Sequence, residues 1–172
     1  MCPGHDVNWK ETDMKITRRD GLKMLGATAL ATVPLKALAA GHTTHTVEML
    51  NKEPDGSERQ VFNPPVIKIA EGDAVNFVST DRGHNSASNA DMLPEGAEEW
   101  KGDINGDIEV TFTVPGVYGF YCTPHQSAGM VGLVLVGDVT PEQIDAAKEV
   151  RQRGKARSRY EDYFAMAEGM IG

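Results

Sequence analysis

From residue 41 onward, apolar and polar residues alternate in short runs that predict β-strands. The alternation is clearest at Ile108–Val114, where every second residue is apolar, as in a strand with one buried face. Gly and Pro turn signals, such as Pro115–Gly116, separate the runs. Many short strands joined by regular turns predict an all-β sandwich or barrel. The predicted strands are Thr44–Leu50, Pro65–Ile69, Ala74–Val78, Ile108–Val114, Val117–Cys122 and Met130–Val136.

The end of the chain has a helical pattern instead. Thr140 is a suitable N-cap, and Pro141 and Glu142 follow it in the first turn of a predicted helix. A second helix is predicted over Lys155–Met170, and its apolar face should pack on the sandwich. The residues of that face are predicted to be Tyr160, Phe164 and Met170, with Tyr163 and Met166 beside them.

The segment from Thr80 to Asn105 is polar and shows no convincing alternation. Loops of this length usually carry a function or contain a small helix. We expect one helical turn within Pro94–Trp100.

Residues 1–40 have the pattern of an export signal. Arg18 and Arg19 resemble a twin-arginine motif, and the apolar run that follows them, Met24–Leu35, is too short to span a bilayer. Small residues at Ala37–Ala39 then suggest cleavage near Ala39 or Ala40. The alternatives are a buried N-terminal helix or a membrane anchor, but no second apolar run follows. The basic region of the signal begins at Met14, which we interpret as the true start. We therefore expect a periplasmic mature protein.

Cleavage would remove Cys2 and leave Cys122 as the single cysteine in an oxidising compartment. A free exported thiol is a redox liability unless a partner such as a metal ion holds it as thiolate.

Cys122 lies with two other metal-binding side chains on one short loop between apolar runs. Cys122, His125 and Met130 fall within nine residues, and a thiolate, an imidazole and a thioether suit copper better than zinc, calcium or magnesium. His84 is the histidine that would complete a His₂Cys plane, with Met130 as a weak axial ligand. Each residue also has a structural explanation, since a buried Cys, a core Met and a turn His are common. The coincidence of all three on one loop favours a metal site.

The spacing of these residues resembles that of the pseudoazurins, bacterial blue copper proteins of the cupredoxin family. The resemblance rests on Cys122-Thr-Pro-His125 followed by Met130, on Gly83-His84-Asn85 upstream, and on Asp91–Glu98 between them. It implies a Greek-key β-sandwich over residues 41–140, with two C-terminal α-helices in residues 141–172. It also implies a type 1 copper site, held by His84, Cys122, His125 and Met130, that carries one electron between partner proteins.

The resemblance assigns further roles. Asn51 and Asn85 match asparagines that tie the ligand loops together, and His125 matches the ligand nearest to solvent. Lys52, Arg82 and Lys101 match three members of a lysine ring around that histidine, where acidic partners dock; Tyr121 stands at the fourth position. The implied partners of this expected monomer are a nitrite reductase-like acceptor and a respiratory-chain cytochrome donor.

The charge distribution narrows the choice of partner. Residues 41–140 contain 5 Lys and Arg against 15 Asp and Glu, whereas the tail from Pro141 contains 6 of each. Such acidity argues against nucleic acid or an anionic membrane as a partner.

Two other functions compete with electron transfer. A copper enzyme needs an open coordination position or more metal centres, and the mature chain offers only the four histidines His42, His45, His84 and His125. A periplasmic copper-binding carrier that does not cycle between oxidation states remains the alternative.

Overall fold

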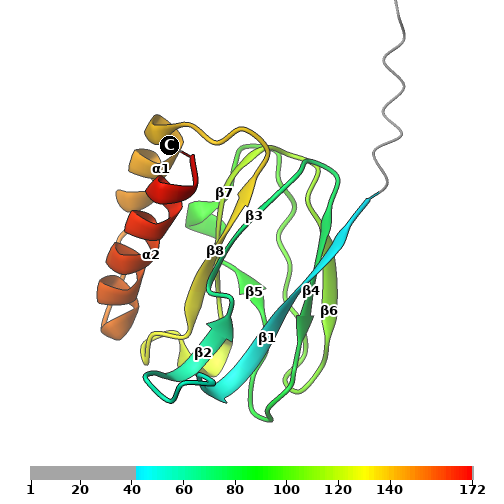
Figure 1. The fold of residues 1–172 in the computed structure, drawn as a ribbon, viewed down its shortest axis with the longest axis vertical. Helices are drawn as coiled ribbons and strands as arrows, with labels where there is room; N and C mark the ends of the chain where they lie inside the picture. Colours follow the sequence, from blue (N-terminus) through cyan, green and yellow to red (C-terminus); the bar gives the residue numbers. More distant parts are fainter. Residues whose placement is uncertain (1–41, 172) are drawn as a thin grey trace, which may run out of the picture. The chain divides into compact units, whose positions relative to one another are not determined.

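The structure, a computed structural model, describes residues 42–171 of the 172-residue chain. Within this range the chain forms two β-sheets with two α-helices after the last strand (Figure 1). The strands are β1 Thr44–Lys52, β2 Arg59–Asn63, β3 Val66–Ile69, β4 Ala74–Val78, β5 Ala87–Ser88, β6 Ile108–Thr111, β7 Gly116–Tyr121 and β8 Val131–Val136. The helices are α1 Pro141–Lys148 and α2 Lys155–Ile171, with 3₁₀-helices η1 Ala90–Met92 and η2 Thr123–His125.

Each sheet has four strands that are not consecutive in the sequence. The first has the order β2-β1-β4-β6, in which β1 pairs antiparallel with β2 and parallel with β4. The second has the order β3-β8-β7-β5, in which β8 pairs parallel with β3 and antiparallel with β7. The predicted all-β sandwich is therefore confirmed.

Strand β8 is the central strand of the whole structure, because both of its faces are covered. All six of its residues are buried. Val134 and Val136 face the first sheet, whereas Leu133 and Leu135 belong to the cluster that includes the helices. A strand covered on both faces is apolar throughout rather than alternating, which explains its sequence, Val-Gly-Leu-Val-Leu-Val.

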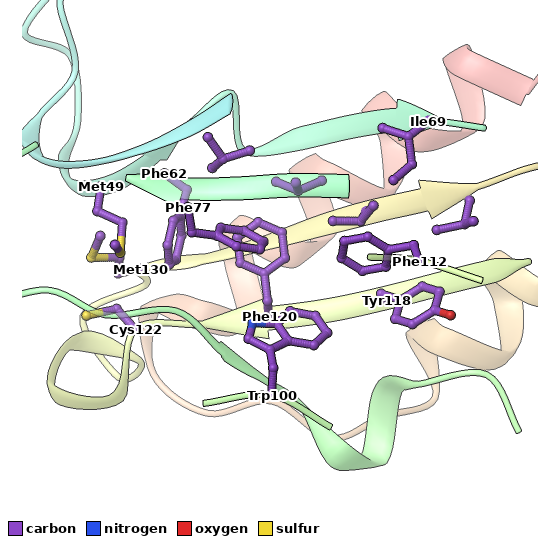
Figure 2. Packing of buried hydrophobic residues seen from close by; sticks show 14 residues of the cluster. Met49, Phe62, Ile69, Phe77, Trp100, Phe112, Tyr118, Phe120, Cys122 and Met130 are labelled. Atoms are coloured by element: carbon purple, nitrogen blue, oxygen red, sulfur yellow. The ribbon is translucent and has the colours of Figure 1, made fainter. Parts of the chain in front are cut away.

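The core between the sheets is aromatic. Phe120 of β7 meets Phe62 and Phe77 of the first sheet edge-on, with ring centroids 4.7 and 5.0 Å apart (Figure 2). Each such pair contributes about 0.5–1.5 kcal/mol beyond the burial of its area. Cys122 and Met130 lie fully buried at one end of this cluster (Figure 2). A well-packed core therefore supports this end of the sandwich.

The two helices cover the second sheet (Figure 1). Helix α1 begins with a capping box, in which Thr140 and Gln143 each bind the other's backbone amide. Helix α2 buries Tyr160 and Phe164, as predicted, and also Tyr163. Met166 and Met170 are instead 44% and 38% exposed, so Met170 was wrongly predicted for the buried face.

The sequence predictions missed two strands and misplaced one helix. Strand β2 contains only two adjacent apolar residues, and β5 is two residues long, so neither shows a period. The predicted strand Ile108–Val114 ends at Thr111. Pro94–Trp100 contains no helical turn; the short helix η1 comes just before it.

The predicted export signal over residues 1–40, its cleavage near Ala39 or Ala40 and the start at Met14 lie outside the described residues. Among residues 42–171, none of the helices combines the length and apolar character needed to cross a membrane.

Candidate metal centre

Residues 122–130, which we call the ligand loop, connect β7 to β8. Helix η2 turns the chain back, and the amide of His125 donates to the carbonyl oxygen of Cys122 over 3.0 Å. The amide of Met130 then donates to the carbonyl of His125 over 3.0 Å, and the amide of Cys122 donates to the carbonyl of Met130 over 2.9 Å. These bonds hold the three candidate ligands of the loop in one compact turn.

The donor atoms of three candidate ligands converge on one point. The Cys122 Sγ atom lies 3.7 Å from Nδ1 of His84 and 3.5 Å from Nδ1 of His125, and the two Nδ1 atoms are 3.1 Å apart. A point equidistant from these atoms lies about 2.0 Å from each, close to ordinary metal–nitrogen bonds of about 2.0–2.1 Å and metal–sulfur bonds of about 2.3 Å. The arrangement therefore fits a metal ion.

His84 is held in the form that a metal requires. It is fully buried, and its Nε2 atom bonds to Oδ1 of Asn51 over 3.0 Å. Because an amide oxygen can only accept, Nε2 carries the proton and Nδ1 keeps its lone pair for the metal. Burial, together with the nearby His125, lowers the pKa of His84 despite the opposing effect of Asp81. The imidazole is therefore neutral around pH 7.

Cys122 is likewise fully buried. Burial raises the pKa of its thiol, although the backbone amides of Asn85 and His125 lower it in part. Without a metal ion the sulfur is therefore protonated, and metal binding releases a proton.

Asn85 joins the two segments that supply these ligands. Its side-chain oxygen accepts from the Thr123 amide over 2.8 Å, and its side-chain nitrogen donates to the Thr123 hydroxyl over 3.0 Å and to the Gly102 carbonyl over 2.9 Å. It is 1% exposed. Asn85 follows His84 and Thr123 follows Cys122, so the bonds between Asn85 and Thr123 hold the two ligand segments together.

Met130 and His125 differ in exposure. Met130 is fully buried beside the aromatic core, whereas His125 is partly exposed. A thioether is a soft, weak donor, and a set of one thiolate, two imidazoles and one thioether would select copper.

Comparison with known proteins agrees with this chemistry. Residues 47–137 match the copper binding proteins of the plastocyanin/azurin family. The chain is also 48% identical over 133 residues to pseudoazurin from Paracoccus pantotrophus, with 76% of this chain and 90% of that protein covered. The chain belongs to the pseudoazurins.

Other members of the family support the same assignment. Pseudoazurin from Methylorubrum extorquens is 36% identical over 145 residues, covering 84% of this chain and 96% of that protein. A solved pseudoazurin structure from Sinorhizobium has 45% identity and a TM-score of 0.70, covering 76% of this chain and 99% of that one. The sandwich is therefore a cupredoxin fold, and this pseudoazurin is a copper-binding electron carrier rather than an enzyme.

The three cations predicted around the site are all exposed in this pseudoazurin. Arg82 is two residues before His84, and Lys101 forms a β-bridge with Ala87. The Lys52 amine lies over Gly56 in the turn between β1 and β2. In this turn hydrogen bonds from Ser57 lower the pKa of Asp55, and the nearby charge of Lys52 adds a smaller effect in the same direction. Lys52 therefore interacts with its own turn.

Sequence reasoning missed the supporting residues Thr123 and Asp81. Thr123 provides two of the three bonds that hold Asn85, and the Asp81 carboxylate accepts from the Asn51 amide over 2.7 Å. These partners lie 30 or more residues apart in the sequence, so no local pattern indicates them.

Proposed function

We propose that this pseudoazurin is a periplasmic one-electron carrier whose single copper ion is bound by His84, Cys122, His125 and Met130. The observation that supports this best is the convergence of three donor atoms within 3.1–3.7 Å of one another, with Nδ1 of His84 left free by the bond between Nε2 and Asn51. In this proposal Asn51 and Asn85 hold the ligand segments in place.

Each proposed ligand would have its own role in binding copper. When bound, copper supplies a Cu(II)/Cu(I) couple. Cys122 would provide the thiolate, His84 and His125 the two imidazoles, and Met130 the weaker thioether. His84 donates to Asn51, and the amide of Thr123, next to Cys122, donates to Asn85. These bonds would limit the movement of the ligand segments, so that little rearrangement would accompany electron transfer. His125 is partly exposed and therefore faces the partner.

A redox titration of the copper-loaded mature protein tests this function. A reversible one-electron couple, with strong thiolate-to-copper absorption in the oxidised form, is expected. The alternative, a copper-binding carrier without redox cycling, predicts a colourless Cu(I) complex that cannot be oxidised reversibly. That result would reject the electron-carrier proposal.

The proposal includes export. Residues 1–40 would form a signal of twin-arginine type, leaving a copper-binding domain over 41–140 and its helical extension over 141–172. Mass spectrometry of the protein from the periplasmic fraction is expected to show a mature N-terminus near Ala39 or Ala40. Recovery of the full chain from the cytoplasm alone would contradict this.

We further propose that the carrier, a monomer, takes electrons from a respiratory-chain cytochrome and passes them to a denitrification reductase such as nitrite reductase. The acidity of residues 41–140 leaves few cations, so the exposed Arg82 and Lys101 should matter most for docking near His125. Lys52 should contribute less because it lies over its own turn.

Reversing the charge of Arg82 and Lys101 is expected to slow electron transfer to a copper-containing nitrite reductase. The double variant Arg82→Glu/Lys101→Glu should lower the second-order rate constant about 10-fold at low ionic strength, because it removes steering toward an acidic partner. The difference should shrink as salt screens the charges. Stopped-flow spectroscopy at several salt concentrations measures both effects.

Lys68→Glu is the matched control for this measurement. Lys68 is exposed and pairs with Leu135, near the end of β8 that is far from the ligand loop. It should leave the rate nearly unchanged. An equal loss in the control, or none in the double variant, would contradict docking near His125.

A further inference from the structure

Arg159 is the one buried residue among the arginines and lysines that the structure describes, with 4% of its surface exposed. It extends from α2 toward two loops. One guanidinium nitrogen, Nη1, donates to the carbonyl oxygens of Gln60 and Gly129 over 2.8 and 2.6 Å. The other, Nη2, donates to the carbonyl of Arg59 over 2.8 Å and to the Glu58 carboxylate over 2.7 Å. A planar guanidinium can satisfy all four acceptors at once, which a lysine cannot do.

The bond to Gly129 reaches the peptide that leads into Met130. This peptide consists of the Gly129 carbonyl and the Met130 amide. The Gly129 carbonyl oxygen accepts a hydrogen bond from Arg159, and the Met130 amide donates one to the carbonyl of His125 over 3.0 Å. Because a peptide bond is planar, hydrogen bonds to both its oxygen and its nitrogen fix the orientation of the peptide plane. This orientation sets the direction in which the Met130 side chain extends from the backbone. Arg159 therefore binds the short backbone segment that carries Met130, the proposed thioether ligand.

The start of α2 makes a second contact with this loop. The amide of Lys155 donates to the carbonyl of Ser127 over 3.1 Å. A side chain at Gly154 would come within 2.7 Å of that same carbonyl oxygen, and one at Gly129 within 3.0 Å of the Arg159 side chain. Helix and loop thus pack closely at Gly129 and Gly154, so a displacement of one at these points affects the other.

The charge of Arg159 is balanced inside this contact. Lys155 and Arg159 hold the pKa of Glu58 down, to about 2, so Glu58 remains ionised at neutral pH. The Glu58 carboxylate compensates the charge of the buried guanidinium, and three carbonyl oxygens accept its remaining hydrogen bonds. Arg159 is therefore a fixed point rather than a mobile surface cation.

We propose that Arg159 is a positioning residue for the copper centre. Its guanidinium holds the Gly129–Met130 peptide and thereby positions Met130. This inference rests on the proposed ligand set. Helix α2 is thereby connected to the metal site, although none of its residues is a proposed ligand. The Met130 thioether would be the weakest of the four proposed donors, so its position depends most on how firmly its backbone is held.

Arg159→Met tests the proposal, because it keeps the apolar stem and removes the guanidinium. Hydrogen exchange of the Met130 amide in the metal-free protein should become about 10-fold faster, since a charge-assisted hydrogen bond to the adjoining carbonyl is lost. In the loaded protein, copper affinity should fall about 10-fold. The reduction potential and the electron spin resonance spectrum should also shift from those of the parent protein.

Lys155→Ala is the matched control. Lys155 binds Glu58 as Arg159 does, but its side chain makes no hydrogen bond to the loop and only its apolar stem lies near Gly129. This variant should keep the parent potential, spectrum and Met130 exchange rate. Arg159→Lys, which keeps the charge beside Glu58 in a compact ammonium group without the planar fork, should give intermediate values.

The outcomes separate this inference from the proposed function. Absence of thiolate-to-copper absorption in the parent protein would reject the proposed ligand set. If the parent has that absorption but Arg159→Met keeps its potential, spectrum and exchange rate, the positioning role is wrong. Equal shifts in Lys155→Ala would also overturn it, because they would trace the effect to Glu58. Should Arg159→Met fail to fold, Arg159→Lys decides: parent values in every measurement overturn the proposal.

Discussion

Replacing Cys122 by serine is expected to abolish the visible absorption of the copper-loaded protein. Cys122 Sγ lies 3.5 and 3.7 Å from the two imidazole nitrogens and is the only thiol among the described residues. A serine hydroxyl is far less acidic and cannot provide the soft anionic sulfur from which the charge-transfer band arises. Copper affinity should fall by more than the roughly 10- to 100-fold that loss of a supporting residue costs. Absorption spectroscopy with copper titration measures both.

The fold of Cys122→Ser should survive. The residues are similar in size, and burial of a hydroxyl costs about 1–3 kcal/mol. An unchanged far-ultraviolet circular dichroism spectrum is the necessary control. A variant that stayed coloured would reject the thiolate assignment.

Asn85→Ala is expected to give the second large effect, this time on stability. The substitution removes all three hydrogen bonds between the Asn85 side chain and its partners Thr123 and Gly102, in a site that is 1% exposed. At about 1 kcal/mol for each bond, the free energy of unfolding should fall by about 3 kcal/mol. The melting temperature should fall by about 10 °C. Urea denaturation of the metal-free protein measures the loss without any contribution from copper.

Thr123→Val provides the graded comparison. It removes the hydroxyl that accepts from Asn85 and leaves the other two bonds in place. A loss of about 1 kcal/mol is expected. If Asn85→Ala is no more destabilising than Thr123→Val, Asn85 does not join the two ligand segments in the way described.

Much of the fold could be predicted from the sequence, because strongly patterned segments carry their own signal. The apolar run of β8 and the capped start of α1 are examples. Strand β2 could not be found, because it depends on pairing with β1 and contains Gln60 at a φ of +53°. Met170 was misassigned because the buried face of α2 is chosen by the sheet beneath it.

At the candidate site, too, residues close together in the sequence could be predicted, whereas contacts between residues far apart in the sequence could not. The spacing of Cys122, His125 and Met130 indicated a soft metal ligand set directly, whereas Asn85 was assigned only through a family resemblance. Arg159 gave no signal at all, because a basic residue on a C-terminal helix ordinarily faces solvent. Its partners Gln60 and Gly129 lie 99 and 30 residues away in the sequence.

The spacing of the ligand loop also bears on what metal binding contributes to thermal stability. Cys122, His125 and Met130 stay close together even in an unfolded chain, whereas His84 lies 38 residues before Cys122. Denatured protein can therefore retain copper through three of the four proposed donors. Since a ligand stabilises the native state only by the difference between its native and unfolded affinities, copper should raise the melting temperature less than its native affinity alone implies.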